Sequence, residues 1–166
     1  MLKTLLTSAI ALSALSLSVP IYSAEQPFAI AIHGGAGTIE KSRFTAEQEK
    51  AYRAKLKEAV ETGYAVLEKG GESLDAITAA INVLENSPFF NAGRGAVYPY
   101  DGAHELDASI MDGRTRQAGA VAGIKHIENP INLARLVMEK SVHVMLSGPG
   151  AEDFAQTQGV PLVENK

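Results

Sequence analysis

The 166-residue sequence contains no cysteine. This absence excludes disulfide bonds, zinc sites built on thiolates and a cysteine nucleophile. Acidic residues outnumber basic ones by 19 to 15, and the formal net charge is −4. Because proteins that bind nucleic acid carry clustered basic surface, this composition argues against a nucleic-acid partner. The sequence also has no internal repeat and no low-complexity tract.

Several catalytic signatures are missing as well. There is no G-x-S-x-G turn and no S-x-x-K motif, and the Ser147-Gly148 pair has no neighbouring base. The histidines show neither an i, i+4 pair nor a His-x-His spacing, so we expect no catalytic metal and a structural role for each. They are His33, His104, His126 and His143.

The first 24 residues have the composition of a secretory signal peptide. Lys3 precedes an apolar run from Leu5 to Val19, and small residues lead up to Ala24. The run is too short for a membrane span and polar sequence follows at once, so we expect cleavage near Ala24 and export to the periplasm. Residues 25–166 then form one domain with no membrane segment.

Two amphipathic helices are predicted in the first half of this domain. Apolar residues recur at helical spacing over 45–67, where Thr45 is the predicted N-cap and a Gly-Gly pair ends the helix. A second helix is predicted over 73–86. Ser73 has a hydroxyl that can cap it, and Pro88 stops it.

Strands are predicted on both sides of these helices. The apolar run FAIAI at 28–32 predicts the first strand. Two runs at 104–111 and 114–124 flank an Asp112-Gly113 pair, which predicts a hairpin with a type I′ turn.

The last third of the chain predicts two more helices and another strand. Pro130 is expected as the first residue of a helix that runs to Lys140. A buried strand is predicted at 142–148, and a short, mostly solvated helix at 150–159. This order predicts an α+β fold with helices on a largely antiparallel sheet. Because the strands at 114–124 and 142–148 are apolar enough to need cover on both faces, we expect further layers from a partner.

Two stretches are unusual enough to carry function. HGGAG at 33–37 follows the first predicted strand, and its bare backbone could approach a phosphate, an amide substrate or a catalytic residue. It lacks the spacing and lysine of a P-loop, which argues against nucleotide binding. In LENSPFFNAGRGAV at 84–97, Asn91 stands before a run of small residues. From the residues alone, Asn91 could orient a substrate or could serve only the turn conformation.

These stretches resemble one known family. IAIHGGAGTI, LENSPFFNAGRGAV and the long segment from HELDASIMDG to GAEDFA are similar to the plant-type L-asparaginases and isoaspartyl peptidases, which are N-terminal nucleophile hydrolases. The resemblance extends from Phe28 to about Gly159.

The resemblance implies a four-layer αββα sandwich made as a precursor that cuts itself at a Gly-Thr bond. The freed threonine of the β subunit is then the nucleophile, and its own α-amino group is the general base. No threonine of this chain stands in that cleavage context, so we expect an α-subunit portion or a truncated precursor, with no catalytic residue of its own and no activity alone. The implied partners are the β subunit in an (αβ)₂ assembly and a small substrate, either L-asparagine or a β-aspartyl dipeptide. Alternatives are a glycosylasparaginase-like amidase and a non-catalytic fragment.

The resemblance also assigns site residues. It places His33, Gly34 and Gly35 beside the nucleophile and makes Asn91 a substrate contact. It implies no organic cofactor, but a structural sodium ion held by main-chain carbonyl groups, which are ligands that a hard cation prefers. The matching positions are Leu84, Glu85, Ser87, Phe90, Ala92 and Arg94.

Overall fold

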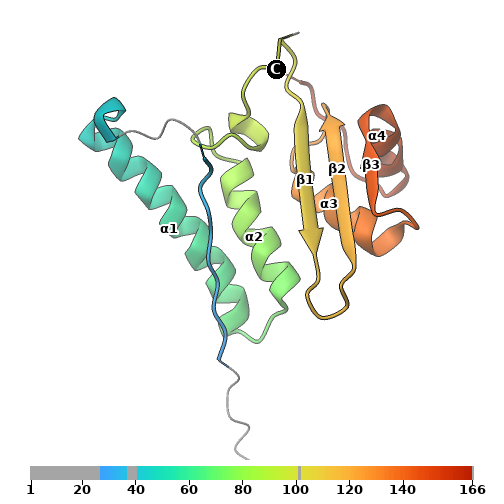
Figure 1. Cartoon of the computed structure of the whole chain (residues 1–166), viewed down its shortest axis with the longest axis horizontal. Helices are drawn as coiled ribbons and strands as arrows, with labels where there is room; N and C mark the ends of the chain where they lie inside the picture. Colours follow the sequence, from blue (N-terminus) through green and yellow to red (C-terminus); the bar gives the residue numbers. More distant parts are fainter. Residues whose placement is uncertain (1–26, 37–40, 101, 166) are drawn as a thin grey trace, which may run out of the picture.

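The computed structural model describes residues 27–36, 41–100 and 102–165, and the predicted signal peptide lies outside them. A pair of helices stands beside a three-stranded sheet that carries two more helices (Figure 1). None of the described helices is long and apolar enough to cross a membrane. In chain order the elements are a 3-10 turn (Lys41–Arg43), α1 (Ala46–Glu68), α2 (Ser73–Glu85), a second 3-10 turn (Gly93–Gly95), β1 (Leu106–Met111), β2 (Ala118–Ile124), α3 (Pro130–Lys140), β3 (Met145–Ser147) and α4 (Gly148–Thr157).

Helix α1 begins where the sequence predicts it. The Thr45 hydroxyl accepts the backbone N–H of Gln48, and the Gln48 side chain accepts the backbone N–H of Thr45. This capping box satisfies two backbone donors that a helix start otherwise leaves free. Gly70, with φ of 78°, follows the end of the helix.

Helix α2 is confirmed, but the predicted cap is wrong. Ser73 is the first helical residue, and Glu72 occupies the N-cap position without a side-chain hydrogen bond. The helix packs closely on α1 because Gly63 of α1 has no side chain: a Cβ there would lie 2.8 Å from the carbonyl oxygen of Ala76.

The sheet has the order β1-β2-β3, with an antiparallel β1–β2 pair and a parallel β2–β3 pair. Helix α3 covers one face (Figure 1). Its inner side and the inner side of the sheet form the core, together with Leu74 of α2 and two alanines of α4. The fully buried residues of this core include Ile124, Leu133, Ala134, Val137, Ala151 and Ala155. The predicted α+β class and the predicted α3 and α4 are confirmed.

The hairpin is confirmed, but its predicted type I′ turn is wrong. The strands are joined by a longer loop in which the backbone N–H of Asp112 donates to the carbonyl of Gln117. Asp112 also accepts the Arg114 N–H and the Thr115 hydroxyl, and the positive φ falls on Arg116 at 63°. The aspartate therefore organises a wider turn through its own carboxylate, which a two-residue pattern does not foresee.

The strand predicted at 28–32 is also wrong. This segment is extended but pairs with no described strand, and it lies across α1 and α2 (Figure 1). The Phe28 and Tyr64 rings have centroids 5.2 Å apart, and Ile30 lies against Gly63. An apolar run indicates that a segment packs against other parts of the protein but does not show whether its neighbours are strands or helices.

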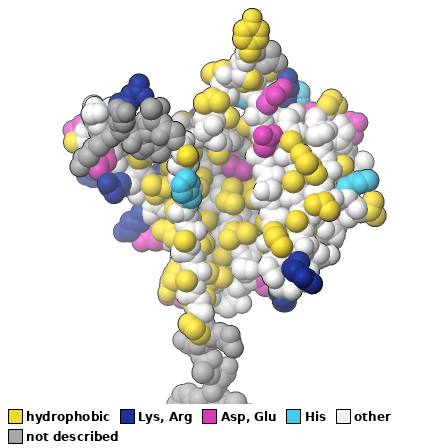
Figure 2. Space-filling view, viewed as in Figure 1, with side chains coloured by type: hydrophobic (Ala, Val, Ile, Leu, Met, Phe, Trp, Pro, Cys, Tyr) yellow, Lys and Arg dark blue, Asp and Glu magenta, His cyan; other side chains and the backbone are white. Residues whose placement is uncertain are grey.

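The buried strand predicted at 142–148 is short and exposed. Only Met145–Ser147 pair with β2, and Val142 and Val144 are 94% and 65% exposed. Because β3 is the edge strand, it has a partner on one side only. Apolar side chains also lie over the sheet face that no described element covers (Figure 2).

The start of α3 is capped by a residue from α2. Pro130 is the first helical residue, as predicted, and Asn129 makes no side-chain cap. The buried carboxylate of Glu85 instead accepts the backbone N–H of Ile131 at 3.0 Å and the side-chain amide of Asn129 at 3.1 Å. A carboxylate at this position also interacts favourably with the positive end of the helix dipole.

The contact between α3 and β2 generates a first prediction. A Cβ on Gly119 would overlap the carbonyl oxygen of Ala134 and lie 2.5 Å from the backbone nitrogen of Met138. Since helix backbone cannot yield locally, Gly119→Ala should lower the free energy of unfolding by about 1–3 kcal/mol in chemical denaturation. Gly113→Ala is the matched control, because nothing lies within 4 Å of that position and its effect should stay within about 0.5 kcal/mol. Equal stabilities for the two variants would contradict the packing described.

The Glu85 contact generates a second prediction. Burial raises the pKa of Glu85 to about 7. The native state therefore holds this proton more tightly than the unfolded state, and its contribution to stability is lost as the pH rises from about 4.5 through 7. Glu85→Gln cannot titrate, so the difference in unfolding free energy between variant and wild type should change by up to about 3 kcal/mol over this range. Parallel pH profiles for the two proteins would contradict the prediction.

Candidate functional site

The two glycine-containing stretches meet at one end of the α1–α2 pair. A Cβ on Gly34 would lie 2.9 Å from Leu56 of α1 and 3.5 Å from the ring of Phe90. The extended segment thus ends beside the loop at 86–96 that follows α2 (Figure 1). The structure brings Gly34, which stands between His33 and Gly35 in the sequence, next to Phe90, the residue before Asn91.

Four aromatic rings pack together beside this junction. Tyr52 of α1 stacks on Phe89 at 4.9 Å between centroids and meets Phe90 edge-on at 5.7 Å. Phe44 also meets Tyr52 edge-on, with ring centroids 5.1 Å apart. Phe90 itself is buried. Such aromatic contacts, which add to the burial of apolar area, fix the base of the loop that carries Asn91.

The glycine stretch is open on one side. Gly35 has φ of 107°, a conformation that side chains disfavour, and no described atom lies within 4 Å of its missing Cβ. Its N–H donates to Nδ1 of His33 at 3.2 Å, so Nδ1 of His33 is the unprotonated ring nitrogen in this contact. Backbone at Gly35 is therefore accessible to an approaching group.

Asn91 has a defined orientation. Its Oδ1 accepts the backbone N–H of Val97 at 2.9 Å. Because a backbone N–H can only donate, the carbonyl oxygen must face Val97, and the NH₂ group of this exposed side chain is directed elsewhere. The structure therefore makes Asn91 a hydrogen-bond donor to whatever approaches it.

The loop between α2 and Asn91 turns carbonyl groups inward. The carbonyl oxygens of Glu85, Ser87 and Phe90 lie under 3.0 Å from the positions that Cβ atoms on Gly93 or Gly95 would take. Three carbonyls of this stretch also accept backbone hydrogen bonds: Leu84 accepts the N–H of Ser87, Phe90 accepts that of Ala92 and Ala92 accepts that of Gly95. An oxygen-rich donor set of this kind fits a hard monovalent or divalent cation.

No group of three or more His, Asp or Glu side chains within the described residues could hold a metal ion. Among the six predicted sodium ligands, Arg94 is exposed, and it lines a cleft of about 360 Å³ together with His104, Lys125 and Asn165.

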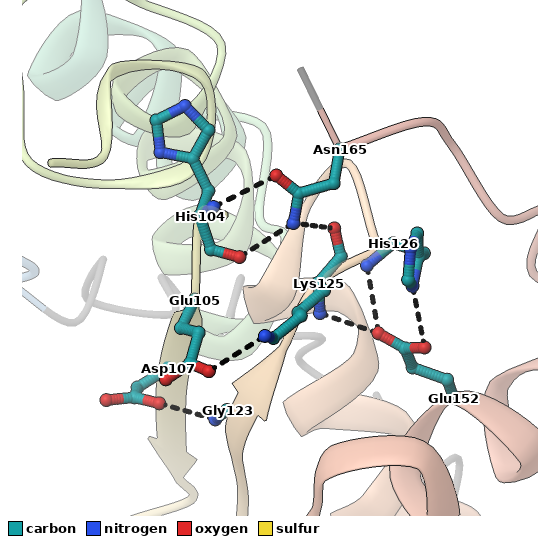
Figure 3. A network of polar contacts seen from close by, with 8 residues as sticks. All are labelled: His104, Glu105, Asp107, Gly123, Lys125, His126, Glu152 and Asn165. Carbon is teal, nitrogen blue, oxygen red and sulfur yellow. Dashed lines mark hydrogen bonds and ion pairs between the residues drawn. The ribbon is translucent and has the colours of Figure 1, made fainter. Parts of the chain in front are cut away.

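A network of polar contacts, which the sequence did not reveal, includes three residues that line this cleft: His104, Lys125 and Asn165 (Figure 3). We call it the Asn165 joint. Asn165 accepts the N–H of His104 at 2.9 Å, and its amide donates to the carbonyls of His104 and Lys125 at 2.7 and 2.9 Å. It joins the chain before β1 to the chain after β2. The partners are 61 and 40 residues apart, so no local pattern could indicate them.

Glu152 of α4 completes the joint (Figure 3). Its carboxylate accepts the N–H groups of Lys125 and His126 at 2.6 and 2.9 Å and contacts Nδ1 of His126 at 2.9 Å. Burial alone would raise the pKa of Glu152, but these hydrogen bonds together hold the pKa below its usual value. The charged carboxylate therefore fixes α4 against the end of β2.

Comparisons with known proteins identify the family. The family model described as asparaginase matches residues 25–166. An isoaspartyl peptidase of Salmonella typhimurium is 54% identical over 134 residues, which cover 81% of this chain and 43% of the relative. An isoaspartyl peptidase of Escherichia coli is 53% identical over 81% of this chain and 42% of its own length. A plant-type L-asparaginase of Pyrococcus horikoshii is 52% identical over 80% of this chain and 42% of its own length.

The chain thus spans less than half the length of these relatives. The match nevertheless includes both the HGGAG stretch and the loop of Asn91, and it confirms the resemblance drawn from the sequence. The chain belongs to the asparaginase family that includes the isoaspartyl peptidases and the plant-type L-asparaginases.

Proposed function

We propose that this chain is the α-subunit portion of a self-cleaving amidohydrolase that acts on L-asparagine and on β-aspartyl dipeptides. The names of the relatives, isoaspartyl peptidase and plant-type L-asparaginase, support both substrates. In this proposal the reacting threonine lies in a β subunit, where its hydroxyl attacks the amide carbonyl and its own amine takes the proton. This chain supplies the walls of the site.

The observation that carries the proposal is the meeting of the Gly34 backbone with Phe90, the residue before Asn91, while the adjacent Gly35 stays open. The open side of Gly35 offers room for the nucleophile of the other subunit. Asn91 directs N–H donors outward, and a donor suits a carboxylate oxygen of the substrate better than it suits the ammonium group. Together the two features describe a site for an acidic amino-acid moiety.

The partner in this proposal is the β subunit, which we place on the uncovered face of the sheet and at the β3 edge. The exposure of Met111 and Met145, each 54%, supports this placement because such apolar surface favours burial. A second sheet and helix layer there would complete an αββα sandwich. We further propose an (αβ)₂ assembly and export to the periplasm after cleavage near Ala24.

The inward carbonyls of Glu85, Ser87 and Phe90 support a structural cation in the same loop. We propose sodium, with Leu84, Ala92 and Arg94 as the remaining ligands. The ion would supply a fixed positive charge that keeps the loop in one conformation, and the chemistry does not pass through it.

The proposal predicts self-cleavage of the complete gene product. Mass spectrometry should show two fragments, the second beginning with threonine, and the cleaved protein should release ammonia from asparagine and leucine from β-aspartyl-leucine. Residues 25–166 expressed alone should release neither product. Hydrolysis by residues 25–166 alone, or by an uncleavable Thr→Val precursor, would refute the assignment.

Asn91→Asp tests the substrate contact. The aspartate keeps an acceptor for the Val97 N–H but loses both donors and adds a charge that repels a carboxylate. Loss of a hydrogen bond to a charged group should lower kcat/KM for asparagine about 10- to 100-fold, while self-cleavage continues. Asn91→Ala serves as the comparison, because it also removes the acceptor that holds the loop. An aspartate variant with unchanged kcat/KM would rule out the role of Asn91 as a donor.

A further inference from the structure

The residue that orients Asn91 is itself held on its other side. The Val97 N–H donates to Oδ1 of Asn91, while the Val97 carbonyl lies 3.3 Å from Nδ1 of His104. Since a carbonyl can only accept, Nδ1 of His104 must carry the proton in this contact. We propose that His104 is a positioning residue for Asn91, acting through the backbone of Val97.

His104 is suited to this task because its main chain is fixed to the core. In the Asn165 joint, the N–H and the carbonyl of His104 are both bound by the side-chain amide of Asn165 (Figure 3). That amide also binds the carbonyl of Lys125, whose N–H is held by Glu152. The ring of His104 points away from Asn165 (Figure 3), and its Nδ1 contacts the carbonyl of Val97 in the segment 97–100, which we call the loop. His104 thus connects the core, through its main chain, to the loop, through its ring.

The loop has few other supports among the described residues. Val97 and Tyr98 are 64% and 67% exposed, and Tyr100 is fully exposed. Tyr98 stacks on the His104 ring itself, with centroids 4.1 Å apart. Ala96, just before this stretch, packs against the core, and the Val97 N–H donates to Asn91. The contacts identified for the Val97 carbonyl and the Tyr98 ring are both made with His104.

The expected consequence concerns which end of the Asn91 amide faces outward. The Val97 N–H and carbonyl belong to consecutive peptide groups that share the Val97 Cα. If the carbonyl loses its contact with His104, the backbone at Val97 is free to rotate, Oδ1 of Asn91 loses its partner, and the amide can turn its oxygen toward the substrate. An oxygen repels a carboxylate, so substrate binding should weaken while the chemistry of the bound complex stays intact. This inference rests on the proposed role of Asn91 in substrate binding.

The test uses three substitutions of His104 in the complete protein. His104→Asn places an amide nitrogen near the position of the imidazole Nδ1 and should retain the bond to Val97. His104→Gln places it one bond too far, and His104→Leu removes it. The leucine and glutamine variants should raise KM for asparagine about tenfold, the weight of one hydrogen bond between neutral groups, with kcat within twofold. The asparagine variant should stay near the wild-type KM.

His126→Leu is the matched control, because His126 belongs to the same joint but contacts Glu152 and not the loop. It should lower the melting temperature and leave KM unchanged. A wild-type KM in His104→Leu, no rescue in His104→Asn, or an equal rise of KM in His126→Leu would overturn the inference.

A second readout does not depend on activity. Hydrogen exchange of the Val97 amide, which Asn91 protects, should accelerate at least tenfold in His104→Leu and not in His104→Asn or His126→Leu. Unchanged exchange in His104→Leu would overturn the inference. If the wild-type protein hydrolyses neither substrate, the proposed function fails, and the exchange data still decide whether His104 holds Val97.

Discussion

The buried carboxylate of Glu85 links the two parts of the molecule on which the site depends. It ends α2 and binds the first free N–H of α3, so it joins the helix pair to the layer that covers the sheet. The backbone of the same residue packs against Gly93, in the loop that carries Asn91. Withdrawing a charge from water is unfavourable unless it is well paired, and here hydrogen bonds and the dipole of α3 offset part of that penalty. The orientation of the helix pair and the position of the loop therefore follow from one contact.

Features decided within a few residues could be read from the sequence. The capping box at Thr45, the proline at the start of α3 and the existence of the hairpin depend on neighbours along the chain, and all three are present. The predictions were wrong where residues distant in the sequence, or a turn longer than two residues, determine the local structure. The segment 28–32 has the composition of a strand but packs with one side on two helices, and the turn after β1 is shaped by the Asp112 carboxylate over six residues. Apolar composition alone could not show that β3 would be an edge strand.

The residues of the candidate site also fall into those that the sequence indicated and those that it did not. The HGGAG stretch and Asn91 stand out in the sequence because glycine clusters and an isolated asparagine are unusual beside regular helices. His104 and Asn165 give no such signal, since nothing in the sequence indicates that a histidine and an asparagine 61 residues apart are in contact. Their roles also depend on backbone groups of Val97 and Lys125, which every residue type possesses. Only coordinates show that these main-chain groups meet.

These contacts explain how an exposed loop can present a side chain in one orientation. Asn91 lies outside the core, and its loop gains rigidity from the aromatic rings beside it and from backbone hydrogen bonds at its far end. The Val97 N–H can only donate and the Val97 carbonyl can only accept, so the direction of the bonds to Asn91 and His104 is determined. An amide held by its oxygen in this way leaves its NH₂ group available to donate. In the proposed function, main-chain geometry thus contributes to the recognition of an acidic substrate moiety by setting which end of the Asn91 amide faces outward.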